Sequence, residues 1–360
     1  MKAIGIILAG GNNNRMKELT AKRAVPALPV AGSFRSIDFA LSSMSNSHIQ
    51  TVAVLTQYNA RSLNEHLSSS KWWNFGRKQG GLFLFTPTVT ADNSDWYRGT
   101  ADAMYQNIDF LKRRHEPYVI ISSGDCVYKL DFNRVLDFHI EKKSDITVVC
   151  KDMMYNDDVS RFGVVRMDDE SRITEFDEKP IEALSNTIST GIYVIRRRQL
   201  IELLEAAAEE NRFDFVNDIL VRYKNVKKIY GYKINSYWNN IADIDAYFKT
   251  NMDFLRPDVR SYFFREEPTI CSKVDDLPPA KFNPGSDISN SLVSSGCIIN
   301  GSVEDSVLFK QVFVGKNTTV KNCVILNDVY IGDNVHLENC IVESRGTINP
   351  NTCYCGEDGV

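Results

Sequence analysis

The sequence predicts an α/β domain built on a mostly parallel sheet, followed by a short parallel β-helix. Two observations lead to this prediction. Short apolar runs alternate with helical patterns from residue 1 to about 250, and a repeat with an offset of 17 residues follows from about residue 286. Alternating strands and helices are typical of a sheet covered by helices on both faces. Short aliphatic repeats are typical of stacked coils.

The composition argues against several classes of protein. A chain of 360 residues with 43% hydrophobic and 24% charged residues is ordinary for a soluble globular protein, and its length suggests two domains. The net charge of -4 argues against binding of nucleic acid or of an anionic membrane. Because no apolar run approaches ~20 residues and no basic segment precedes an apolar one, we expect no membrane span and no secretory signal.

The cysteines indicate a reducing compartment. The eight cysteines are scattered and form no CxxC pair or zinc spacing, so we expect reduced thiols in a cytoplasmic protein. Cys353 and Cys355 are the only close pair, and such a pair alone is a weak indication of a metal.

Apolar runs predict the strands of the sheet, and amphipathic segments predict its helices. We expect buried strands at 52–55, 118–122, 146–150 and 192–195, and helices at 101–114, 133–143 and 198–210. Sheets of this kind bind ligands at the carboxyl ends of their strands. The loop after the first strand is therefore the expected nucleotide site.

That first loop is the most informative stretch of the chain. The apolar run 4–9 leads into Gly10 and Gly11, then into three asparagines at 12–14 and Arg15. A strand, a glycine turn and a helix start present backbone N–H groups to an anion. An arginine adds a charged fork for phosphate. The asparagines stand where such a loop is expected to hold a further glycine.

Segment 96–103 predicts a loop that ends in a helix start. We expect Gly99 or Thr100 to cap this helix and the backbone there to touch a base or sugar, although a plain helix start has the same pattern. Asp125 follows another apolar run. It is expected to bind Mg²⁺ bridging phosphates, the alternative being a capping residue.

Two further candidates follow along the chain. Glu178 and Lys179 stand side by side at a strand end, where the pair could bind a sugar hydroxyl and a phosphate. A solvated charge cluster is the alternative. Ser189 opens the next buried strand with small polar neighbours.

The C-terminal part repeats. Val303, Val320 and Leu337 recur at one offset, and an aliphatic residue recurs every five or six positions, so three short sides make one coil. About four coils fit before residue 360. So short a β-helix has exposed ends, and we expect it to pack on something and the protein to form oligomers. The predicted divisions are a domain at 1–255, a linker at 256–285 and a β-helix at 286–360.

Together these segments resemble the sugar-phosphate nucleotidylyltransferases, in particular bacterial glucose-1-phosphate adenylyltransferase (ADP-glucose pyrophosphorylase). The resemblance covers nearly the whole chain. It rests on LAGG and the arginine of the first loop, RSIDF at 35–39, LTQY at 55–58, WYRGTADA at 96–103, SGD at 123–125, FDEKP at 176–180, STGIY at 189–193, YW at 237–238 and the terminal repeats.

The resemblance implies a Rossmann-like nucleotidyltransferase domain, a left-handed β-helix and a reaction. In that family ATP and glucose 1-phosphate give ADP-glucose and pyrophosphate with Mg²⁺, in glycogen biosynthesis. It also implies roles for individual residues. These are Arg15 and Asp125 in catalysis, with Asp125 also as a metal ligand; Gly10, Gly11, Gln57, Gly99 and Thr100 in nucleotide binding; and Tyr97, Gly163, Glu178, Lys179 and Ser189 in sugar-phosphate binding.

Several residues depart from the family pattern on the phosphate side. Asn13 replaces a loop glycine, Val25 stands in place of a lysine, and Cys126 in place of a histidine. A Cβ at position 13 is expected to crowd the phosphates. Lys22 or Arg23 could compensate for the missing lysine, although from a different point.

The residues at the expected metal-binding positions depart further from the family pattern. Asn240 replaces the second metal carboxylate and Asn239 the adjacent arginine. Asp125 is then the one remaining carboxylate, so Mg²⁺ binding by this chain is doubtful. Asp243 could substitute, but strand alternation is expected to point it elsewhere.

This pattern is similar to the regulatory D-type (GlgD-type) subunit of the Gram-positive bacterial enzyme, which partners a catalytic subunit in a heterotetramer. The resemblance therefore implies a chain that binds glucose 1-phosphate, with ATP as a further candidate ligand, and that catalyses little alone. Two other hypotheses stay open: a catalytic enzyme with a rearranged metal site, and a binding protein or acyltransferase that uses mainly the β-helix. His336 is the candidate residue for the acyltransferase, although a surface histidine is favoured.

Overall fold

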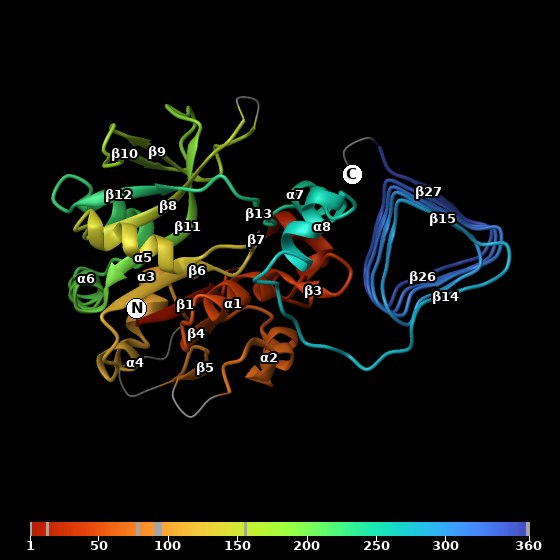
Figure 1. Ribbon diagram of the computed structural model, residues 1–360, viewed down its shortest axis with the longest axis horizontal. Helices are drawn as coiled ribbons and strands as arrows, with labels where there is room; N and C mark the ends of the chain where they lie inside the picture. The colour runs from red at the N-terminus through yellow and green to blue at the C-terminus, as the bar shows by residue number, and fades with distance from the viewer. Residues whose placement is uncertain (1, 12–13, 77–79, 90–95, 155–156, 358–360) are drawn as a thin grey trace.

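The protein has an α/β part followed by a triangular β-helix (Figure 1). The computed structural model describes residues 2–11, 14–76, 80–89, 96–154 and 157–357. Within these ranges no helix is both long enough and apolar enough to cross a membrane. The predicted fold class is confirmed.

A sheet with nine described strands forms the α/β part. Its order is β10-β9-β11-β6-β1-β4-β5, with β8 paired to β11 and β12 paired to β8. Among these strands β10 and β11 run against the others, so the sheet is mostly parallel. The strands are β1 (Ala3–Ala9), β4 (Thr51–Thr56), β5 (Gly81–Phe85), β6 (Tyr118–Ser123), β8 (Ile146–Asp152), β9 (Gly163–Met167), β10 (Ile173–Glu178), β11 (Thr187–Arg196) and β12 (Ile229–Lys233).

Two hydrophobic clusters lie on the two faces of this sheet. Neighbouring residues of β1 divide between them, because Ile6 belongs to one cluster and Ile7 to the other. The predicted helix at 101–114 is instead two short helices. The helices are α1 (Ser36–Asn46), α2 (Arg61–Leu67), α3 (Thr100–Tyr105), α4 (Ile108–Lys112), α5 (Phe132–Glu141), α6 (Arg197–Glu209), α7 (Ile244–Asp253) and α8 (Pro257–Phe264).

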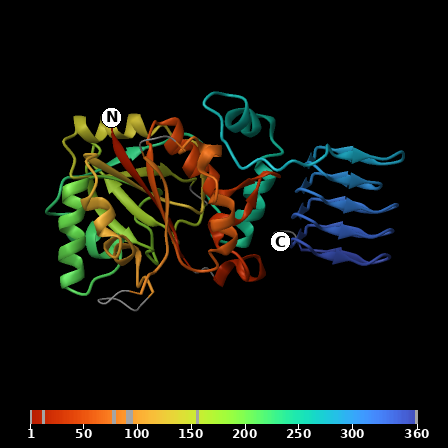
Figure 2. The same ribbon diagram turned by 90° about the horizontal axis from the view of Figure 1, so that it is seen from below.

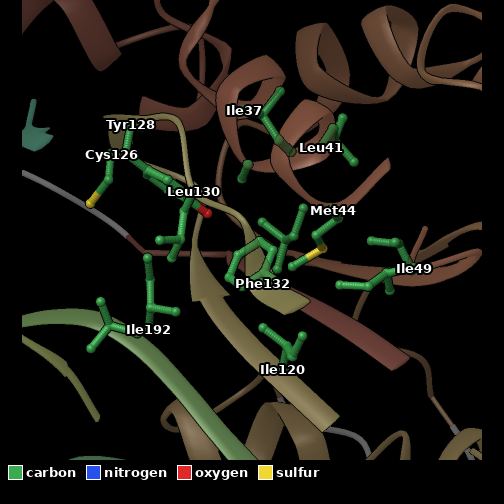
Figure 3. Close-up of a cluster of buried hydrophobic side chains, with 14 of the residues drawn as sticks. Ile37, Leu41, Met44, Ile49, Ile120, Cys126, Tyr128, Leu130, Phe132 and Ile192 are labelled. Carbon is green, nitrogen blue, oxygen red and sulfur yellow. The ribbon is translucent and has the colours of Figure 1, made fainter. Parts of the chain in front are cut away.

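Helix α1 shows how one face is packed. Ile37, Leu41 and Met44 recur at positions i, i+4 and i+7, which places them on one side of the helix. They point toward the side chain of Phe132 at the start of α5 (Figure 3). Gly5 in β1 lies beneath the same helix, where a Cβ would collide with the sulfur of Met44. Close approach of helix and strand therefore requires glycine there.

The C-terminal strands stack as parallel rungs (Figure 2). They form three sheets, in the orders β14-β17-β20-β23-β26, β15-β18-β21-β24-β27 and β16-β19-β22-β25. Val303, Val320 and Leu337 pair in register with buried side chains, as the repeat predicted. The strands are Lys281–Phe282, Asp287–Ser289, Leu292–Val293, Ile298–Ile299, Ser302–Glu304, Val307–Leu308, Phe313–Val314, Thr319–Lys321, Val324–Ile325, Tyr330–Ile331, His336–Glu338, Ile341–Val342, Thr347–Ile348 and Cys353–Cys355, which are β14 to β27 in order.

Asparagines form the corners of these coils. Asn317, Asn334 and Asn351 all have positive φ, a conformation that asparagine tolerates better than most residues. Their side-chain amides hydrogen-bond from one coil to the next, at 3.2 Å and 3.0 Å. The repeated corner residues therefore serve both the turn and the stacking.

The segment 256–285, predicted as a linker, contains helix α8 and strand β14. Pro257 occupies the first turn of α8, where the missing proline N–H costs nothing. Strand β14 already pairs with β17. Each coil contributes one strand to each sheet of the β-helix. Two of the three described sheets contain five strands, so they indicate one coil more than the four expected.

The β-helix packs on the α/β part along one side. One continuous cluster contains Phe254 and Phe263 from the region of α7 and α8 together with Phe309 and Leu326 from the β-helix. The sequence predicted packing by an open end, whereas these contacts come from the side of the coils.

Candidate functional site

A cavity of about 510 Å³ lies at the carboxyl ends of β1, β4 and β6. Its position agrees with the expectation for sheets of this kind. Of the residues predicted to bind nucleotide or metal, six line it together with Tyr97: Gly10, Gly11, Gln57, Gly99, Thr100 and Asp125.

Gln57 fixes one wall of the cavity. Its Oε1 accepts a hydrogen bond of 2.7 Å from the backbone N–H of Tyr97, and its Nε2 donates one of 3.3 Å to the Tyr97 carbonyl. The side chain thus pairs with the loop as a neighbouring strand would. Gly10 lies directly against it, because a Cβ on Gly10 would come within 3.3 Å of the Gln57 Cβ.

Gly99 and Thr100 also line the cavity. Gly99 is the N-cap residue of α3, and a Cβ there would overlap the carbonyl of Phe213. Thr100 does not cap the helix with its side chain, since its hydroxyl accepts a hydrogen bond of 2.8 Å from the backbone N–H of Phe215. The 213–215 segment therefore holds this loop in place. Sequence reasoning missed that segment, because nothing near residue 100 points to it.

Cys126 connects Asp125, which lines the cavity, to Asn240 on a neighbouring strand. Strand β13 (Trp238–Asn240) pairs with β7 (Cys126–Tyr128), which places Asn240 opposite Cys126. The Asn240 amide donates to the Cys126 sulfur at 3.4 Å, and that thiol donates to Asp125 Oδ1 at 3.4 Å. Burial raises the pKa of Cys126 well above its usual value, so the thiol stays protonated as this donor.

As ligands for a metal ion, Asp125 and Asn240 are weaker than a pair of carboxylates. Asp125 Oδ1 also accepts a bond of 2.5 Å from the Ser123 hydroxyl. Asn240 Oδ1 accepts a bond of 3.0 Å from the backbone N–H of Ala242. The one neutral oxygen that Asn240 could offer to a cation therefore already accepts one hydrogen bond, which leaves it a single lone pair. Asp125 supplies the negative charge of this pair.

The candidate substitutes for the lost groups lie elsewhere. Asp243 caps α7, accepting from the backbone N–H of Ala246 at 2.7 Å, and it pairs with Arg161. Arg23 pairs with Glu343 of the β-helix, and Lys22 and Arg23 line a second cavity between the two parts. Val25 lines the first cavity with a buried aliphatic side chain.

Arg15 lies in the 3-10 helix Asn14–Thr20, close enough to Asp158 for the two charges to interact. Its charge helps to lower the pKa of Asp158, after hydrogen bonds from Ser160 and the charge of Arg161. Arg15 is outside the set of described residues that line the cavity. Asn13 lies outside the described residues altogether.

The predicted sugar-phosphate residues gather at the β9–β10 hairpin and β11. Glu178 pairs across the strands with Gly163, where a Cβ would come within 2.9 Å of Glu178 Oε2. Lys179 Nζ lies 3.3 Å from Glu178 Oε1, and its φ of 51° is a left-handed conformation that lysine rarely adopts. Burial raises the pKa of Glu178, against the lowering effect of Lys179.

Aromatic side chains connect this group to the cavity. Ser189 donates a hydrogen bond of 3.3 Å to the Tyr193 hydroxyl, and Tyr193 packs against Phe215 with ring centroids 5.3 Å apart. Tyr97 packs on the same buried cluster. The negative charge of Asp214, which sequence reasoning did not single out, adds to the effect of burial in raising the pKa of both Glu178 and Tyr193.

Comparison with known protein families covers both parts of the chain. Residues 4–256 match the family described as nucleotidyl transferase. Residues 278–359 match the family described as GlmU-like, C-terminal hexapeptide. Residues 257–277, which contain α8, lie between the two matches.

Individual relatives narrow the family. The chain is 39% identical over 360 residues to glucose-1-phosphate adenylyltransferase of Geobacillus stearothermophilus, covering 99% of this chain and 93% of the relative. It is 38% identical over 320 residues to that of Clostridium novyi, covering 88% and 84%. The chain belongs to the glucose-1-phosphate adenylyltransferase family. The family member of Bacillus subtilis is similar too, with 37% identity over 322 residues, 89% of this chain and 84% of that one.

Proposed function

We propose that this chain is a regulatory subunit of a glucose-1-phosphate adenylyltransferase, with little or no catalysis of its own. It binds glucose 1-phosphate, retains a cavity for ATP, and joins a catalytic subunit in a cytoplasmic heterotetramer for glycogen biosynthesis. The observation that carries the proposal is Asn240 beside Asp125, with its amide oxygen bonded to Ala242. Binding of Mg²⁺ at this place is weak for the same reason.

The energetic argument concerns charge. Glucose 1-phosphate adds negative charge to a site where phosphates of ATP already gather, and cationic groups must offset the charge that develops. Val25 supplies no cation, and Asn240 removes one anionic ligand of the metal. Each lost group costs about 3–4 kcal/mol of transition-state stabilisation, or roughly 10²–10³ in rate, although such losses do not add fully.

The sugar-phosphate side supports binding. Glu178 is an acceptor for sugar hydroxyls and Lys179 a cation for the phosphate, and the two side chains lie 3.3 Å apart. Gly163 leaves room for Glu178. A chain that keeps these groups while losing charge at the metal side suits a binding role better than turnover.

The experiment measures ADP-glucose synthesis by the purified chain with ATP, glucose 1-phosphate and Mg²⁺. We expect turnover at least about 100-fold below the usual enzyme range of ~1–10³ s⁻¹. The variant Asn240→Asp is expected to bind Mg²⁺ at least about 10-fold more tightly than the parent, whereas Asn240→Ala is not. Co-expression with a catalytic subunit, followed by native mass measurement and kinetics, then tests the regulatory role.

A catalytic enzyme with a rearranged metal site is the second candidate. Its support is the retained Asp125 in the cavity and the names of the relatives. It predicts substantial turnover by the chain alone, lost in Asp125→Ala. The same assay therefore separates the two candidates.

A further inference from the structure

The outer face of the last two coils carries four side chains of metal-ligating type. His336 and Glu338 come from β24, and Cys353 and Cys355 from β27. The two strands pair so that His336 lies beside Cys353 and Glu338 beside Cys355. Leu337 between the first two is buried in the core of the coil, so strand alternation turns its neighbours outward.

The ligand atoms are already close together. One ligand atom each of His336, Glu338 and Cys355 lies within 4.8 Å of the other two. His336 Nε2 is 3.6 Å from Glu338 Oε2, and Cys353 Sγ is 3.6 Å from Cys355 Sγ. In a tetrahedral zinc site with bonds of about 2.0–2.3 Å, neighbouring ligand atoms lie about 3.3–3.8 Å apart. The ligand atoms of His336, Glu338 and Cys355 thus lie near the spacing of a zinc site, and the Cys353 sulfur lies close to that of Cys355.

We propose that His336, Glu338, Cys353 and Cys355 bind one Zn²⁺ on the surface of the β-helix. One imidazole, one carboxylate and two thiolates suit zinc, a borderline-soft cation that takes nitrogen, oxygen and sulfur ligands. The site is distinct from the cavity at the sheet, since all four residues lie in the last two rungs of the β-helix.

The charged side chains around this site are compatible with a bound cation. Lys321 Nζ, on the preceding coil, lies 4.0 Å from Glu338 Oε1. The other oxygen, Oε2, faces His336. Glu338 can therefore keep its contact with Lys321 and offer Oε2 to zinc. Such a contact on a ligating carboxylate also fixes its orientation.

Zinc bound here ties the last rung to the one before it. Strand β27 has a described neighbour on one side only, and its residues are exposed. A metal that holds both strands stabilises the folded coil in proportion to RT ln(1 + [Zn²⁺]/Kd). The site is therefore a structural clip at the end of the β-helix.

The test uses the full reduced chain with Zn²⁺, and with Co²⁺ as a spectroscopic probe. We expect one metal ion per chain, tetrahedral cobalt absorption with a thiolate charge-transfer band, and a zinc-dependent rise in melting temperature. Cys355→Ser and His336→Ala are each expected to weaken zinc binding at least about 10-fold. Cys271→Ser and His115→Ala remove an exposed thiol and an exposed imidazole elsewhere and are expected to change nothing.

Three outcomes would overturn the proposal. One is the absence of stoichiometric binding by the reduced chain. Another is equal weakening by the site variants and the controls. The last is a Cys353–Cys355 disulfide in the isolated protein together with no metal uptake after its reduction. Circular dichroism of each variant checks its folding, and we expect the coil to remain folded because all four side chains point away from its core.

Discussion

Glu178 combines burial with a negative charge, and both properties bear on its role. It lies against Gly163 and Lys179, and burial raises the pKa of its carboxyl above the ordinary value of 4.5. An ionised carboxylate in such a place costs folding free energy unless a ligand satisfies it. Such a residue is better explained by ligand binding than by stability.

We predict that Glu178→Gln weakens glucose 1-phosphate binding roughly 10- to 100-fold, since a hydrogen bond to a charged group contributes about 1.5–3 kcal/mol. The same change should raise the melting temperature at neutral pH. Because the folded pKa lies above the unfolded one, the parent's penalty is full above the folded pKa and disappears below the unfolded pKa. The advantage of the variant should therefore shrink as pH falls toward 4.5.

Calorimetric titration and thermal melts across pH check both halves of this prediction. The exposed Glu182→Gln makes the same charge change a few residues away and serves as the control. Unchanged binding in Glu178→Gln, or a stability difference independent of pH, contradicts the role given to this carboxylate.

Single residues also show what the sequence could and could not provide. Gly10, Gln57 and Asp125 each follow a strand of the parallel core, so chain order alone placed them at one edge of the sheet. The hydrogen-bond partners of these residues could not be predicted from the sequence. The contact of Gln57 with the Tyr97 backbone spans 40 residues, and no local pattern encodes it. The hydrogen bond from the Ala242 N–H to Asn240 is local, two residues along the chain, but the sequence alone did not predict it.

At the scale of secondary elements, the contacts at the start of α7 indicate whether Asp243 has a catalytic or a structural role. Its Oδ1 accepts the N-cap hydrogen bond from Ala246, and its other oxygen pairs with Arg161. Both oxygens are thus engaged at a helix end. This arrangement explains the residue without a metal.

We predict that Asp243→Ala lowers the free energy of unfolding by about 1–2 kcal/mol, through loss of the cap and of a partly exposed ion pair. Asp243→Asn keeps an oxygen that can cap the helix and should recover about half of the loss. Chemical denaturation measures both changes. A loss of nucleotide or metal binding in Asp243→Asn, with stability intact, would instead support a rearranged metal site.

Elements were predictable where the pattern was periodic. The four expected strands lie within β4, β6, β8 and β11, and the aliphatic repeat set the register of the β-helix. Within the predicted linker, α8 is a short helix whose apolar residues, such as Phe263, pack in a cluster that also contains Phe309 of the β-helix. Tertiary contacts of this kind leave no period in the sequence. The predicted helix 101–114 is also interrupted, between α3 and α4.

At the scale of the whole molecule, the α/β part and the β-helix share a core. Phe309 is 1% exposed and lies in one cluster with Phe39, Phe254 and Phe263. Polar contacts reinforce this junction, including a bond of 2.8 Å from the Ser294 hydroxyl to the Gly32 carbonyl. Two parts joined in this way are expected to unfold together.

We predict that Phe309→Ala lowers the free energy of unfolding by about 3–5 kcal/mol and splits one thermal transition into two. The space left by the missing Phe309 ring lies between the α/β part and the β-helix. Each part therefore loses contacts with the other while its own core remains. Val329→Ala is the matched control, because this side chain is equally buried but lies wholly within the β-helix core. It should cost on the order of 2 kcal/mol without separating the transitions. Calorimetry distinguishes the cases: a single transition in Phe309→Ala, or two in Val329→Ala, would mean that the shared aromatic cluster does not couple the two parts.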